Sequence, residues 1–136
     1  MTTTTWLRVS SVISLLFALG HVLGGLKYWS PMGDNPVLQV MRATEFDTMG
    51  ARRSYFDFYM GFGHSLSVAQ VMLAILLWQL ATLARINALD VRPLIGVIAL
   101  ATLAGGVIAW RYIFPVPALF SLVLVGSLTA AYGAAR

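Results

Sequence analysis

Four apolar segments, each long enough to cross a lipid bilayer, restrict the possible folds of this chain more than any other feature. A helix needs about 20 mostly apolar residues to cross roughly 30 Å of hydrocarbon, and we predict spans at about residues 6–29, 54–84, 93–112 and 117–132. Of the 136 residues, 59% are hydrophobic and only 10% are charged, which is typical of a chain surrounded by lipid. Backbone groups in hydrocarbon need partners within the protein, and no alternation of period two indicates a barrel, so the spans are predicted to be helices.

The connections between the spans define the predicted topology. Residues 85–92 and the FPVP sequence at 114–117 are short, and short connections make neighbouring helices antiparallel. An even number of spans places both termini on one face of the membrane. The sequence therefore predicts an all-α fold, in which residues 1–136 form one integral membrane domain, an antiparallel bundle of four transmembrane helices.

The first connection, about residues 30–53, is too polar to cross the membrane and too long for a plain turn. After a predicted turn around Pro31, Gly33 and Pro36, apolar residues recur at helical spacing, which predicts a short interfacial helix. Its apolar residues are Val37, Leu38, Val40, Met41 and Phe46, and its polar side carries Gln39, Arg42, Glu45 and Asp47. Such a helix either shields the helix ends or gates a pocket, and both alternatives stay open.

The basic residues point to lipid as the partner. The nine Lys and Arg residues are scattered near the span ends and form no run, which is typical of anchoring at headgroups and not of a nucleic-acid surface. Four lie toward the face with the termini and five toward the opposite face, which we call the loop face. If Lys27 and Arg111 serve a site, the positive-inside rule favours cytoplasmic termini. Cysteine is absent, which excludes disulfides and thiolate chemistry.

Ionisable side chains inside the predicted spans need an explanation, because a charge at the bilayer centre costs about 3 kcal/mol on insertion scales. His21 and His64 lie at matching depths on consecutive antiparallel helices, roughly 5 to 8 Å from the midplane at about 1.5 Å per residue. Asp57 precedes His64 by two helical turns. Its predicted height matches that of Lys27, Arg53 and Arg111, and ion pairs with them would make its charge tolerable. His64, Asp57 and His21 are therefore the candidate catalytic residues.

The first hypothesis for these residues is a pocket for a small lipophilic molecule with a polar or anionic head. The tail would lie between the helices, and Arg111 or Arg53 would hold the head. If the protein is an enzyme, which the sequence leaves open, His64 or His21 would transfer a proton, since imidazole titrates near neutral pH. Both imidazoles would then face a shared hollow and not lipid. The predicted ligand-binding residues are Arg111, Arg53, Lys27, Tyr59 and Trp110.

Two alternatives stay open for the histidines. His21 and His64 suit bis-histidine ligation of haem b, and both follow a glycine, which leaves little side-chain bulk beside them. Alternatively, they form interhelical hydrogen bonds worth about 1 kcal/mol, in an accessory subunit of a larger membrane complex or a homo-oligomer. Neither has another histidine or a carboxylate three or four residues away, so a metal site made of protein ligands alone is not predicted.

Four motifs occur in a familiar order: FALGH in the first span, RSYFDFYMGFG at the start of the second, LLWQL near its end, and RYIFPVP between the third and fourth. Together they resemble a group of small bacterial four-helix integral membrane proteins, broadly similar in size and layout to the DoxX-like proteins. The resemblance covers nearly the whole chain and implies a four-helix fold in the bacterial cytoplasmic membrane. Its motifs have no assigned catalytic roles, so it implies no activity.

Overall fold

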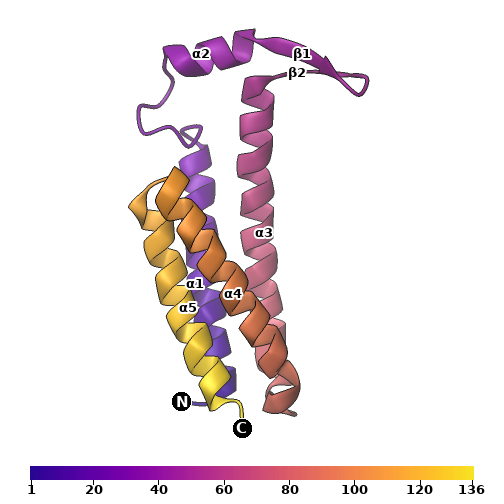
Figure 1. Ribbon diagram of the computed structural model, residues 1–136, viewed down its shortest axis with the longest axis vertical. Coiled ribbons are helices and arrows are strands. Elements are labelled where there is room, and N and C mark those ends of the chain that lie inside the picture. The colour runs from indigo at the N-terminus through magenta and orange to yellow at the C-terminus, as the bar shows by residue number, and fades with distance from the viewer. The chain divides into compact units, whose positions relative to one another are not determined.

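The computed structural model describes residues 1–136 and contains five helices and one β-hairpin (Figure 1). Four of the helices are long and apolar enough to cross a membrane. The predicted all-α fold, with four spans and a short helix between the first two, is confirmed. The elements are α1 Thr3–Gly25, α2 Pro36–Ala43, β1 Glu45–Thr48, β2 Ala51–Ser54, α3 Tyr55–Leu83, α4 Ala88–Tyr112 and α5 Pro115–Ala134.

α4 starts earlier than predicted, because Asn87 caps the helix ahead of Pro93. The side chain of Asn87 accepts a hydrogen bond from the Leu89 amide at 3.1 Å and starts the helix at Ala88, as asparagine at an N-cap commonly does. Pro93 therefore lies inside α4, and the predicted start of the third span at about residue 93 is too late. α5 likewise begins at Pro115, where a proline suits a first helical turn because its missing amide hydrogen has no partner to lose.

The short helix between the first two spans is followed by a hairpin that the sequence analysis missed. α2 ends at Ala43, and residues 45–54 form two antiparallel strands in which Glu45 pairs with Ser54. The predicted continuation of the helix to Phe46 and Asp47 is therefore wrong. The turn consists of Met49 and Gly50, with φ of 48° and 81°, and positive φ at both central residues is what the tightest hairpin turns require.

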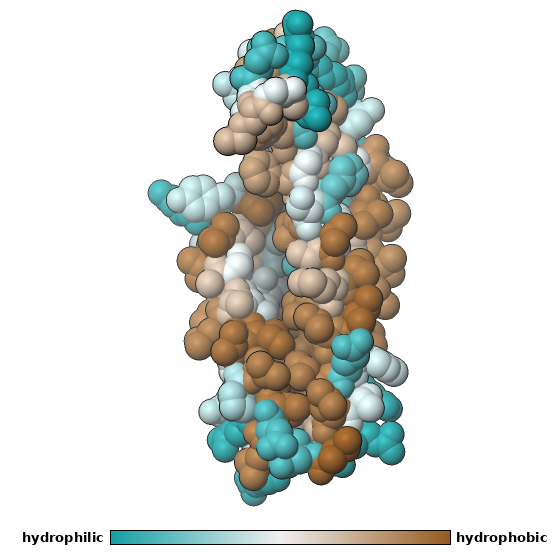
Figure 2. All heavy atoms as spheres, turned by 90° about the vertical axis from the view of Figure 1, so that its right-hand side faces the viewer, coloured by the Kyte–Doolittle hydropathy of each residue, from teal (hydrophilic) through white to brown (hydrophobic).

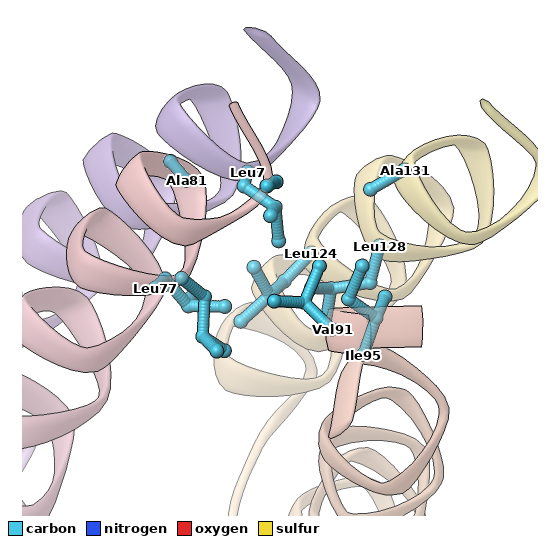
Figure 3. Close-up of a cluster of buried hydrophobic side chains, with 10 residues drawn as sticks. Leu7, Leu77, Ala81, Val91, Ile95, Leu124, Leu128 and Ala131 are labelled. Atoms are coloured by element: carbon cyan, nitrogen blue, oxygen red, sulfur yellow. The ribbon is translucent and has the colours of Figure 1, made fainter. Parts of the chain in front are cut away.

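The chain forms two compact units, residues 1–17 with 70–136, and residues 18–69. In the first unit, buried residues of α1 and α3 pack with those of α4 and α5, and α4 lies beside α5 (Figure 1). Leu7, Leu77, Ile95 and Leu128 come from four different helices and are completely buried (Figure 3). The cluster also contains Leu80, Ala81, Ala84, Val91, Leu124 and Ala131. This layer joins the four long helices into a bundle.

Serine hydroxyls add polar contacts between the helices of the first unit. The Ser10 and Ser127 hydroxyls lie 2.7 Å apart, between α1 and α5, and Ser11 donates to the Ala74 carbonyl of α3 at 2.6 Å. Lipid provides no hydrophobic effect to drive helices together, so membrane helices depend on close van der Waals packing and such hydrogen bonds. Small side chains on α1 allow both.

Candidate functional site in residues 18–69

The second unit is organised around the indole of Trp29, in the turn that follows α1. Its Nε1 donates to the His21 carbonyl at 2.8 Å. The ring lies against glycines of both α1 and α3: a Cβ atom added to Gly25 would lie 2.8 Å from its Cζ2, and one added to Gly63 would lie 2.5 Å from its Cη2. Because real Cβ contacts stay beyond 3.0 Å, the indole fits between the two helices only where these residues are glycines.

The backbone after α1 carries Trp29 to this place. The Trp29 amide donates to the Gly24 carbonyl at 3.0 Å and the Tyr28 amide to the Gly25 carbonyl at 2.9 Å, the pair of bonds that defines a Schellman motif. Tyr28 and Trp29 both have positive φ, 56° and 47°, which costs a non-glycine residue about 1–2 kcal/mol. The Tyr59 hydroxyl donates to the Trp29 carbonyl at 3.2 Å. The predicted first span to residue 29 is therefore too long, because α1 ends in this motif.

Both candidate histidines lie against the Trp29 ring. The ring centroids of His21 and Trp29 are 5.1 Å apart, and those of His64 and Trp29 are 5.2 Å apart. His21 Nδ1 also lies 2.9 Å from the Ser67 hydroxyl. The structure thus brings the two imidazoles to one indole, and the Trp29 ring packs against both of them in place of the expected open hollow. His64 is exposed on the surface of α3.

The position of Trp29 bears directly on the haem alternative. A porphyrin with His21 and His64 as axial ligands must lie between the two imidazoles. The indole is in contact with both rings and is anchored by its hydrogen bond to the His21 carbonyl. With the indole packed against both candidate ligands, these residues do not fit haem in this arrangement.

Asp57 caps α3. Its Oδ2 accepts from the Ser54 amide at 2.8 Å and from the Ser54 hydroxyl at 3.0 Å, and its own amide donates back to Ser54 Oγ at 3.1 Å. Reciprocal bonds of this kind form a capping box, and the Ser-x-x-acid spacing at 54–57 was the missed sequence signal. Neither Lys27 nor Arg53 lies within 4.0 Å of the carboxylate, so the predicted ion pairs with these two residues are wrong.

A shallow depression of about 310 Å³ lies along one face of α3. The helical part of its lining follows a spacing of four residues, from Asp57 through Gly61 to Ser65, which keeps it on one face. Phe58 and Phe62 are 43% and 74% exposed, and nothing lies within 4 Å of the position of a Cβ atom at Gly61. The lining residues are Arg53, Asp57, Phe58, Gly61, Phe62 and Ser65.

Arg42 has a different role from the predicted one on the polar side of α2. Its guanidinium lies 4.3 Å from the Phe56 ring centroid and 5.0 Å from that of Tyr28, and it forms an ion pair with Asp34 at 2.8 Å. Contacts between a guanidinium and an aromatic face are worth about 0.5–2 kcal/mol. Arg42 therefore ties α2 to the turn after α1 and to the first turn of α3.

The remaining predicted ligand-binding residues have separate places. Lys27 is exposed in the turn after α1, and Arg53 is exposed at the end of β2, where its Nη1 donates to the Arg52 carbonyl at 2.7 Å. Tyr59 supports the Trp29 backbone. Trp110 and Arg111 belong to the first unit, in the last turn of α4, and their part in a site stays a prediction.

No family model, curated protein or solved structure matches this chain, so the resemblance to DoxX-like proteins stays a prediction. The fold itself defines the class of protein. Four helices are apolar enough to span a bilayer, and hydrophobic residues cover much of the visible surface of the long helices (Figure 2). The chain is a small multi-pass membrane protein built on a four-helix bundle.

Proposed function

We propose that this protein binds a small lipophilic molecule with a polar head in the depression on α3. The observation that carries the proposal is a groove with two charged residues at one end and mainly apolar residues, apart from Ser65, along the rest of its length. Arg53 and Asp57 lie where β2 passes into α3, and the exposed rings of Phe58 and Phe62 follow along the helix. Charged groups are tolerated at the ends of membrane helices and apolar groups along them, so this groove matches an amphiphile lying parallel to α3.

The depression is shallow and open, so its size limits only the part of a ligand that it can contact. Small-molecule sites usually measure about 300–1,000 Å³, and the depression, at about 310 Å³, is at the lower limit. The site therefore suits a head and the first part of one chain. Gly61 leaves the space for that chain, since no neighbouring atom lies within 4 Å of a Cβ position there.

The histidines have an indirect part in this proposal. His21 and His64 do not line the depression; they lie against Trp29, which packs the end of α1 against Gly63 of α3. They would keep the helix that carries the groove in place. The proposal therefore assigns binding, and a reaction catalysed by His21, His64 or Asp57 stays a prediction.

Mass spectrometry of the full-length protein, gently extracted from its membrane, tests the proposal. Gly61→Leu fills the groove, and Gly126→Leu on α5 is the matched control, because both glycines have open space around their Cβ positions. We expect a bound amphiphile in the wild type and in Gly126→Leu, and its loss in Gly61→Leu. Equal retention by both variants would refute the proposal, and reproducible copurification with one large complex instead of a lipid would favour an accessory subunit.

We also propose that the protein resides in a bacterial cytoplasmic membrane with both termini in the cytoplasm. The two termini lie at the same end of the first unit (Figure 1). Arg8 and Arg92 lie over the rings of Trp78 and Tyr132, with 4.9 and 4.4 Å to the ring centroids. Aromatic and basic residues together are typical of the boundary between lipid and water, and basic residues favour the cytoplasmic side.

A further inference from the structure

The charged end of the groove carries two opposite charges that form no direct ion pair. Arg53 and Asp57 both line the depression, yet no ion pair within 4.0 Å joins them. A ligand with one charge would satisfy one of them and meet the other with repulsion, whereas a ligand with both charges would satisfy both. The arrangement therefore favours a head group that carries one positive and one negative charge.

We propose that the ligand is a single-chain lipid from the surrounding bilayer whose head carries a phosphate and an ammonium group, as a lysophosphatidylethanolamine does. This inference rests on the proposed function. Arg53 would bind the phosphate, Asp57 would bind the ammonium group, and the chain would lie over Gly61 beside Phe58 and Phe62.

Both charged residues have bonding capacity left for such a head. A guanidinium has five N–H donors, and the one bond recorded for that of Arg53 goes to the Arg52 carbonyl, so donors remain for two parallel bonds to phosphate oxygens. A carboxylate has about four acceptor sites, and Asp57 directs Oδ2 to the two donors of Ser54. Its other oxygen remains for an ammonium group.

The dimensions favour one chain over two. The depression of about 310 Å³ follows a single face of α3, and the Phe58 and Phe62 ring centroids are 6.3 Å apart. A second acyl chain would have to lie outside this groove, on the lipid-facing surface, where it would gain nothing relative to the bilayer. Binding should therefore not improve when a second chain is added.

Competition binding on the full-length protein tests the head-group preference, with native mass spectrometry as the readout. The probes are lysophosphatidylethanolamine and lysophosphatidylglycerol with the same acyl chain, and diacyl phosphatidylethanolamine. We expect the wild type to prefer the ethanolamine head over the glycerol head by about fivefold, the upper range for an exposed ion pair. We expect lysophosphatidylethanolamine to bind at least as tightly as its diacyl counterpart.

Asp57→Asn should abolish that preference without unfolding α3, because the amide oxygen can still accept from Ser54. Asp47→Asn in β1 is the matched control, removes the same charge in the same unit, and should keep the preference. Arg53→Gln should weaken the binding of both lysolipids. This inference would be overturned by equal binding of the two lysolipids or by tighter binding of the diacyl lipid. If that binding is still lost in Gly61→Leu, the proposed function stays intact. Binding insensitive to Gly61→Leu would overturn both.

Discussion

Replacing Gly63 with alanine tests how the second unit is packed. The new Cβ atom would lie 2.5 Å from Cη2 and 2.6 Å from Cε3 of the Trp29 ring. The ring cannot easily retreat, because its Nε1 is bonded to the His21 carbonyl at 2.8 Å and a Cβ position at Gly25 lies only 2.8 Å from it on the α1 side. Overpacking of this kind costs about 1–3 kcal/mol.

Gly61→Ala is the matched control for this change. It lies two residues away in α3, and its Cβ atom would meet nothing within 4 Å. Both substitutions gain about 1 kcal/mol of helix propensity, so that gain cancels in the comparison. The free energy of unfolding of Gly63→Ala should therefore be about 1–3 kcal/mol lower than that of Gly61→Ala.

The assay is unfolding of the ligand-free protein in mixed micelles, followed by circular dichroism and by Trp29 fluorescence. Phenylalanine in place of the other three tryptophans isolates the Trp29 signal; these are Trp6, Trp78 and Trp110. In a Trp29→Ala background, the cost of Gly63→Ala should disappear, as a double-mutant cycle would show. Equal stability of Gly63→Ala and Gly61→Ala, with unchanged Trp29 emission, would refute the packing of the indole against α3.

Three further predictions concern other parts of the chain. Asp57→Ala should lower the free energy of unfolding by about 1 kcal/mol through loss of the capping bonds, measured by denaturant titration, whereas Asp57→Asn should retain most of the stability; equal losses would contradict the capping role. Because the Trp29 indole packs against both imidazoles, protein incubated with haem should show no Soret band that depends on His21, and a band abolished by His21→Ala would contradict this. The chain has no cysteine, so Met49→Cys in the hairpin should react with an impermeant maleimide on intact spheroplasts and Arg136→Cys only after lysis, and the reverse pattern would invert the proposed orientation.

The four spans were predictable because each depends on the hydropathy summed over about 20 residues, so no single residue determines whether a segment is predicted to span the membrane. Their ends were not, because an end depends on one or two local bonds. Asn87 starts α4 ahead of Pro93, and the Schellman bonds stop α1 before Trp29. The hairpin was not predicted for a similar reason. Its Met49-Gly50 turn lacks the Asn-Gly or Asp-Gly pair that is the strongest sequence signal for a two-residue hairpin turn.

The candidate site shows the same division between regular geometry and local detail. The constant rise of a helix was enough to predict matching depths for His21 and His64, and both do lie against one ring. The identity of that ring could not be predicted. Trp29 has the place and type of an interfacial anchor, and its return between the helices depends on positive φ at Tyr28 and Trp29 and on the glycines that admit the ring.

The MGFG sequence at 60–63 connects this packing with the proposed binding site. An α-helix turns about 100° per residue, so Gly61 and Gly63 point about 200° apart, on nearly opposite faces of α3. At Gly63 the missing side chain admits Trp29 from α1, and at Gly61 it leaves the groove open. The two functions should therefore separate by mutation: a side chain at position 61 blocks the groove while the indole stays in place, and one at position 63 displaces the indole while the groove stays open. A glycine pair required only for close helix packing would have both members on one face, and this pair does not.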